Sequence, residues 1–205
     1  MKNKYLLLVI SLLFSIVLVA CNSEKPKKEV EEPAASESST SKEEDTVNTS
    51  DDGKTITNET GTYTLIKKVD GNETATSGPF TVTIPQVTVV TAELTDETAA
   101  SYGSKNFPYI QVDMDISHET ENTDTILGSF VKLVTNTGEQ LDPDIVMSDI
   151  IDGEFYGKVN KSGSYAYVLK NSQPEDIEWV RVIIDSPLDS SHQEIGKPFD
   201  IRVNF

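Results

Sequence analysis

The chain of 205 residues carries 34 Asp and Glu against 17 Lys and Arg, which gives a formal net charge of −17 at pH 7. A chain this acidic repels nucleic-acid phosphates and has no basic stripe to attract them, so nucleic-acid binding is excluded. Cys21 is its one cysteine, which rules out a disulfide within the chain.

The first segment has the pattern of an export signal. Lys2 and Lys4 are followed by an uncharged apolar run from Tyr5 to Ala20. A permanent membrane-spanning helix needs about 20 apolar residues, and this run is too short before the chain turns polar at Asn22. We therefore expect residues 1–20 to be a cleaved signal peptide.

The end of this segment, Leu18-Val19-Ala20-Cys21, resembles the lipobox of bacterial lipoproteins. The resemblance implies cleavage before Cys21 and a diacylglyceryl thioether on its sulfur; the alternative is an ordinary signal peptide with an incidental cysteine. Two acyl chains, at about 0.8 kcal/mol per buried methylene, suffice for lasting attachment. We expect a protein held by lipid on the extracytoplasmic face of the cell membrane.

Residues 21–60 form a polar, acidic stretch with almost no apolar residues. Val30 and Val47 are its only large aliphatic residues before Ile56, and it contains no aromatic residue. Such a stretch buries too little apolar surface to offset the entropy of ordering, which predicts a disordered tether. The remaining residues, 61–205, have the usual size of a single domain.

Within residues 61–205, short segments alternate between apolar and polar side chains with period two, which predicts β-strands. Pro85 predicts an edge position, a bulge or a break within the first of these segments. Helical spacing is confined to the short stretches 95–101 and 145–151. The predicted strands are 80–94, 107–116, 130–134 followed by a turn and 140–141, 165–169, 177–184 and 199–205.

Short strands separated by Gly, Ser, Asn, Asp or Pro favour an antiparallel sandwich of two sheets over a barrel. We therefore predict an all-β, immunoglobulin-like antiparallel β-sandwich of about seven to nine strands. The disulfide and tryptophan arrangement of antibody domains is missing, since Trp179 is the only tryptophan and no cysteine lies in the domain.

Several segments of the domain are similar to a known family. They are Gly78-Pro79, Tyr109-Ile110-Gln111-Val112-Asp113-Met114, His118-Glu119-Thr120-Glu121-Asn122-Thr123, Lys132 to Leu141, Lys161-Ser162-Gly163 and Glu178 to Ile184. With the lipobox and the acidic tether before them, they resemble surface lipoproteins of low-GC Gram-positive bacteria that carry a C-terminal immunoglobulin-like (telokin-like) domain of unknown function. The resemblance implies a fold and a location, and it brings no catalytic residues or cofactor.

An acidic loop is one candidate site. Carboxylates at short spacing supply the oxygen ligands that Ca²⁺ prefers, although the ordered spacing of an EF-hand is absent. The alternative is a solvated acidic loop without a metal. The residues predicted for a weak Ca²⁺ site are Asp142, Asp144, Asp149, Asp152 and Glu154.

Three tyrosines form a second candidate site. Tyr165 and Tyr167 share one face of a predicted strand, and Tyr156 precedes them in sequence. Exposed tyrosines could stack on sugars or on a partner's side chains. The alternative is that they pack one sheet against the other.

Catalytic patterns are missing from the sequence, which has neither a Gly-x-Ser-x-Gly elbow nor a phosphate-binding glycine loop. His118 and His192 stand in polar contexts that suggest loops, and Asp113 and Asp115 read as the solvent side of a strand. We expect a non-catalytic binding domain for an envelope protein or a cell-wall polymer. The alternative function is an extracytoplasmic hydrolase of cell-wall glycan or peptide.

Overall fold

The computed structural model describes residues 47–126 and 131–205. The predicted signal peptide, Cys21 and the predicted tether up to residue 46 lie outside the described residues. No helix in the described ranges is long and apolar enough to cross a membrane. The elements are β1 (Asn48–Thr49), β2 (Thr55–Asn58), β3 (Gly61–Ser77), β4 (Phe80–Leu94), α1 (Asp96–Tyr102), β5 (Asn106–His118), β6 (Thr123–Thr125), β7 (Lys132–Thr135), β8 (Gln140–Leu141), β9 (Glu154–Tyr156), β10 (Val159–Val168), the 3₁₀ helix η2 (Pro174–Asp176), β11 (Trp179–Ile184), β12 (Leu188–Asp189) and β13 (Phe199–Asn204).

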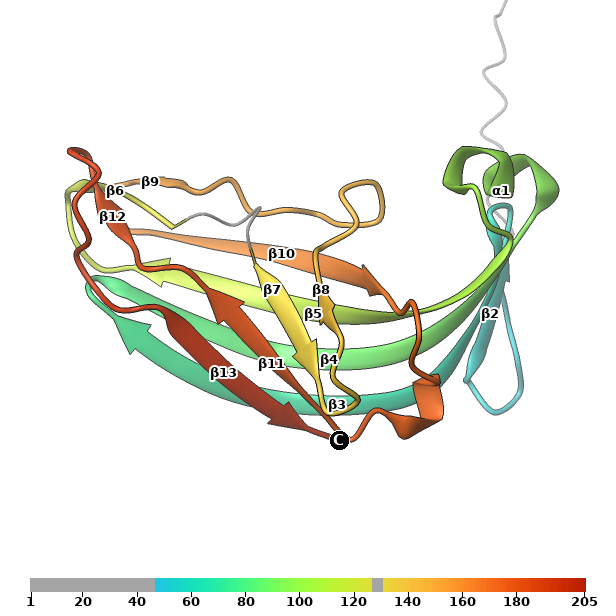
Figure 1. Cartoon of the computed structure of the whole chain (residues 1–205). Coiled ribbons are helices and arrows are strands. Elements are labelled where there is room, and N and C mark those ends of the chain that lie inside the picture. The colour runs from blue at the N-terminus through green and yellow to red at the C-terminus, as the bar shows by residue number, and fades with distance from the viewer. Residues whose placement is uncertain (1–46, 127–130) are drawn as a thin grey trace, which may run out of the picture. The chain divides into compact units, whose positions relative to one another are not determined.

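In the part of the chain that the structure describes, the strands form three antiparallel sheets, with the orders β1-β2-β3-β4-β5-β10, β13-β11-β7-β8 and β12-β6-β9. Figure 1 shows the long strands β3, β4, β5 and β10 curving together, with β7, β11 and β13 crossing over one face. This confirms the predicted all-β antiparallel sandwich. The strand order does not confirm the immunoglobulin-like topology, which stays a prediction. In the large sheet, β3, β4 and β5 lie side by side as a simple meander.

The main core lies between the large sheet and the four-stranded sheet. The large sheet contributes Ile110, Val112 and Met114 of β5, and the facing sheet contributes Val180 and Val182 of β11. These are alternate residues of two strands that the sequence predicted by their period of two. The predicted turn at 136–138 is also confirmed, because it joins β7 to β8 as a hairpin.

β4 contributes to two hydrophobic clusters on opposite faces of the sheet. Val87 and Val89 point into the main core, whereas Val90 and Ala92 join a second cluster. The register of β4 against β5 shifts between Thr83 and Gln86, so Pro85 sits in a bulge where a strand can lack an N–H donor. Of the three options predicted for Pro85, the structure has the bulge.

The folded unit begins earlier than predicted. Strands β1 and β2 fall within the stretch 21–60 that we expected to be tether, and β2 pairs with β3 of the folded domain. Threonine supplies the physical reason, because its branched side chain favours strands. Facing threonines form hydrogen-bonded pairs across β2 and β3, with Thr57 Oγ1 3.0 Å from Thr62 Oγ1.

β3 is the longest strand, and the sequence did not reveal it. Beyond Leu65 its sheet partner within the described residues is β4 alone, so this part of β3 is an edge strand. Two register shifts and the charges of the adjacent Lys67 and Lys68 make this edge unfavourable for pairing with a strand of another chain. The same edge lies near β13 of the facing sheet, where the strands leave a cleft.

Candidate functional site

The acids of the predicted Ca²⁺ site have separate partners. Asp142 pairs with Lys132, and Asp144 Oδ1 accepts the backbone N–H of Val146 at 2.9 Å. The stretch 145–151, which we predicted as a possible helix, instead has a turn at 145–147 and an isolated β-bridge at Asp149.

The other three predicted ligands also lie apart. Asp149 pairs with Ser164 through the backbone, Asp152 Oδ2 is 3.5 Å from Lys161 Nζ, and Glu154 accepts the Tyr156 hydroxyl at 2.6 Å. Across residues 47–126 and 131–205, no three His, Cys, Asp or Glu side chains converge in a way that could hold a metal. The structure therefore does not bring the five acids together.

The three tyrosines are split between core and surface. Tyr165 and Tyr167 are 0% exposed and belong to the main core, and burial raises the pKa of both hydroxyls. Their hydroxyls also serve the interior: Tyr165 accepts the Ile151 N–H at 3.2 Å, and Tyr167 donates to the Val131 carbonyl at 3.3 Å. The partner contact predicted for these two is therefore corrected. Tyr156 is 64% exposed and free to contact a partner.

His118 is not in a polar loop, as its sequence context had suggested, but ends β5 inside the protein. Its side chain is 0% exposed and lies 4.7 Å, ring centroid to centroid, from Phe80. Nδ1 donates to the Gly157 carbonyl at 2.7 Å, while Nε2 lies 2.9 Å from Asp124 Oδ2 and 3.1 Å from the Thr120 hydroxyl. The buried His118 and Asp124 and the half-buried Thr120 (together called the buried triad) are thus satisfied by one another and by the backbone, and the imidazole ring has no solvent-exposed surface.

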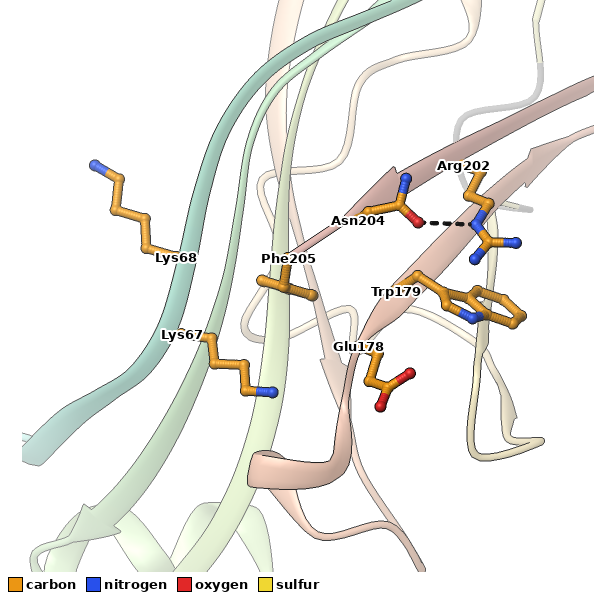
Figure 2. A pocket seen from close by; sticks show the side chains of 7 residues that line it. All are labelled: Lys67, Lys68, Glu178, Trp179, Arg202, Asn204 and Phe205. Atoms are coloured by element: carbon orange, nitrogen blue, oxygen red, sulfur yellow. Dashed lines mark hydrogen bonds between the residues drawn. The ribbon is translucent and has the colours of Figure 1, made fainter.

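A cluster of polar and aromatic side chains lines a cleft of about 560 Å³ in the part of the chain that the structure describes. It opens where the edge of β3 meets the ends of β11 and β13, and Figure 2 shows the side chains around it. We call this the cationic cleft. It is lined by Lys67, Lys68, Glu178, Trp179, Arg202, Asn204 and Phe205.

A stacked pair forms the centre of the cationic cleft. Trp179 of β11 and Asn204 of β13 are register partners, and both point away from the core. Arg202 lies on the same outer face, with its guanidinium carbon 4.3 Å from the centroid of the Trp179 ring. Its Nε donates to Asn204 Oδ1 at 3.0 Å, the bond dashed in Figure 2. The guanidinium plane is therefore fixed by a ring on one side and an amide on its edge.

The two lysines of β3 have different roles. Lys67 Nζ donates to the Ile177 carbonyl at 2.8 Å and so ties the edge of β3 to the segment before β11. Lys68 Nζ is 3.1 Å from Asp70 Oδ1. Figure 2 shows Lys67 extending toward Glu178, whereas Lys68 points to the other side of β3. Lys67 thus faces the cleft and Lys68 borders it.

The cationic cleft reverses the sign of charge that prevails over the chain. The chain has twice as many acids as Lys and Arg, 34 against 17. The side chains that face the cleft instead include Lys67 and Arg202 against the single acidic side chain Glu178, while Lys68 at its border is paired with Asp70. A local excess of positive charge in an acidic protein focuses anionic groups on that spot.

A second hollow, of about 410 Å³, lies against the second hydrophobic cluster. It is lined mainly by apolar side chains, among them Ile56, Tyr63, Leu65 and Val90, with Tyr109 at its base. Burial raises the pKa of Tyr109 to about 12. This hollow has one cation, Lys54, and lacks the stacked guanidinium of the cationic cleft.

Sequence reasoning missed the cationic cleft because its residues come from three distant segments. The visible signals were the lone tryptophan and the adjacent lysines, and neither one indicates a cleft. Only the register of β11 with β13, which pairs Trp179 with Asn204, brings the aromatic ring beside Arg202.

Comparison with known proteins finds a relative among bacterial lipoproteins. No family model matches the chain. The SPbeta prophage-derived uncharacterized lipoprotein YonS of Bacillus subtilis (strain 168) is 29% identical over 146 residues, which are 70% of this chain. The chain spans 66% of that relative's length.

Two solved structures are weakly similar to the chain. A functionally unknown protein from Listeria monocytogenes EGD-e has a TM-score of 0.47 at 14% identity, over 69% of this chain and 88% of that one. A conserved hypothetical protein from Bacillus anthracis has a TM-score of 0.41 at 17% identity, over 64% and 96%. The similarity to the Bacillus lipoprotein supports the interpretation of the chain as a Gram-positive, extracytoplasmic lipoprotein.

Proposed function

We propose that this protein is a lipid-anchored, non-catalytic binding protein of the cell envelope, which contacts its ligand at the cationic cleft. Cys21 carries the lipid, and the β-sandwich presents the cleft outside the membrane. The ligand belongs to an envelope protein or a cell-wall polymer.

The stacked pair of Trp179 and Arg202 is the observation that carries this proposal. Both side chains point away from the core into a cleft, and they are held in place before any ligand arrives. Tryptophan and arginine are the residue types that dominate binding energy at protein interfaces. Pre-ordered side chains lose little conformational entropy when a ligand binds, which raises affinity.

The geometry of the remaining polar groups supports binding over catalysis. The buried triad has the residue types of a catalytic site, but its histidine and carboxylate are enclosed in the protein. Asp113 and Asp115 accept hydrogen bonds from Ser164 at 2.9 Å and Ser162 at 2.6 Å across the sheet. These carboxylates therefore take part in hydrogen bonds between strands, on the face that the sequence predicted to be the solvent side of the strand.

Crosslinking from within the cleft tests the proposed function. Glu178 is replaced by the photoreactive residue p-benzoylphenylalanine in the full chain on intact cells, and the exposed loop residue Ser191 is replaced in the control. We expect one recurrent adduct from position 178, absent from position 191 and lost when Arg202→Gln is added. Equal adducts from both positions would contradict a role for the cleft.

Fatty-acid labelling tests the anchor separately. We expect radiolabelled palmitate to be incorporated into the full chain and not into its Cys21→Ser variant, with release of that variant into the medium. Labelling that survives Cys21→Ser would disprove the anchor without bearing on the cleft.

A further inference from the structure

We propose that the cationic cleft recognises a small oxyanion, a carboxylate or phosphate group on a compact end or branch of its ligand, through the guanidinium of Arg202. The inference rests on the proposed function, since it names the ligand class of the same cleft. It concerns the group that the cleft recognises first, whatever larger molecule carries that group.

The placement of Arg202 is what points to an oxyanion. Trp179 covers one face of the guanidinium at 4.3 Å, and Asn204 accepts the Nε hydrogen at 3.0 Å. The two terminal nitrogens have no hydrogen-bond partner among the described residues. Arginine so held presents a planar pair of donors whose geometry matches the two oxygens of a carboxylate or phosphate.

A neighbouring arginine shows what this arrangement leaves open. Arg181 lies opposite Arg202 in the register of β11 and β13, on the same outer face of the sheet. Its guanidinium is already paired with both carboxylate oxygens of Asp200, and this pairing lowers the pKa of Asp200. Arg202 lacks such an internal carboxylate, so the oxyanion must come from outside.

Two further side chains define the surroundings of the anion. Lys67 uses its ammonium to reach the Ile177 carbonyl at 2.8 Å, which leaves two of its three N–H groups for the cleft. Glu178 on the opposite wall adds an acceptor for a hydroxyl or amine of the ligand. The cleft therefore favours an oxyanion that carries a hydrogen-bond donor nearby.

Size and charge favour a compact ligand over a long polyanion. A volume of about 560 Å³ is within the usual range for small-molecule sites. The net charge of −17 repels an extended polyanion along the rest of the surface, whereas a small anion meets only the positive cleft.

The first test uses Trp179, which is the only tryptophan in the chain and so reports on the cleft alone. The full chain, purified in detergent, is titrated with inorganic phosphate and with acetate at constant ionic strength, against chloride. We expect a saturable change in tryptophan emission with the oxyanions and none with chloride. A linear response equal to that of chloride overturns the proposal.

Calorimetric titration with the same anions then compares matched variants. Arg202→Gln should weaken binding about tenfold or more, because it removes charge-assisted hydrogen bonds. Arg202→Lys keeps the charge and should recover only part of the affinity. Arg181→Gln removes the same charge from the same sheet face and should leave binding unchanged. Equal loss in the variants of Arg181 and Arg202 would mean that net charge, and not the cleft, governs binding.

Glycerol phosphate and poly(glycerol phosphate) distinguish two sources of the oxyanion. Tighter binding of the monomer supports a compact ligand, whereas tighter binding of the polymer, per phosphate, overturns the preference for a compact one. The anion titrations and the crosslinking at position 178 can fail independently of each other. If that adduct depends on Arg202 but no oxyanion binds, the proposed function stands and the ligand class is wrong.

Discussion

The buried triad and the cationic cleft use similar side chains in opposite ways. In the triad, both ring nitrogens of His118 have partners, and the side chain of Asp124 is only 3% exposed. In the cationic cleft, Arg202 is exposed and has donors to spare. A cluster of residues with catalytic or binding chemistry therefore indicates function only when it is accessible and its donors are unsatisfied. Where the protein satisfies every donor itself, the cluster holds strands together.

The largest effect should come from breaking the buried triad. Asp124→Ala removes the buried carboxylate that lies 2.9 Å from His118 Nε2 and so breaks a buried charge pair, and we expect a loss of about 3 kcal/mol or more in the free energy of unfolding. Urea denaturation measures it. Asp70→Ala, which removes an exposed ion pair with Lys68, is the control and should leave the midpoint nearly unchanged. A similar small change for Asp124→Ala would show that the triad does not hold β5 to β6.

Glu139 is a second acidic residue whose hydrogen bonds are all made within the protein, and the pH dependence of stability tests its role. Burial alone would raise the pKa of Glu139, but its hydrogen bonds from the backbone N–H groups of Lys170, Asn171 and Ser172 outweigh burial and lower it. Because the folded-state pKa is depressed, its stabilisation is present above the unfolded-state value of about 4.3 and is lost as pH falls through the folded value.

Glu139→Gln should therefore cost about 1–3 kcal/mol at neutral pH, and the gap to the natural protein should close on acidification. Thermal melts from pH 7 to pH 3 measure both. A gap that stays constant over this range would show that the charge of Glu139 does not hold the 170–172 loop.

The cationic cleft should behave in the opposite way. Arg202→Gln removes an exposed stack, so we expect a loss of only about 1 kcal/mol or less in stability, together with loss of the crosslink from position 178. Circular dichroism melts and the crosslinking assay compare the two. A variant that unfolds as readily as Asp124→Ala would place Arg202 with the structural residues.

The smallest effect should come from Lys68, whose ammonium points away from Arg202. Lys68→Gln removes a positive charge next to the cleft but none of its free donors. Stability and crosslinking should both match the natural protein. A loss of the crosslink would extend the binding surface across β3.

The sequence predicted those features that depend on local pattern. Tyr109 to Met114 alternates without interruption, so β5 was predicted, and Ala99 with Ala100 marked the short helix. β3 was missed because its inward residues are sparse: Val69 and Ala75 are separated by Gly71 and by a bulge between Asp70 and Glu73.

The site depended on long-range geometry that local pattern does not encode. Arg202 had no visible partner until β13 was placed beside β11. His118 was misread because Glu119 and Thr120 make its surroundings in sequence polar, while Phe80 and Phe155 bury it in space. In the acidic loop, residues that are close in sequence do not form a common site, since Asp142, Asp152 and Glu154 each contact a different partner.

The two buried faces of β4 have a consequence for how the domain unfolds. Since β4 serves the main core through Val87 and the second cluster through Val90, a single backbone carries both. Neither cluster can open without pulling on the strand pairs that align the other. We therefore expect the two sides of the sheet to unfold together as one cooperative unit.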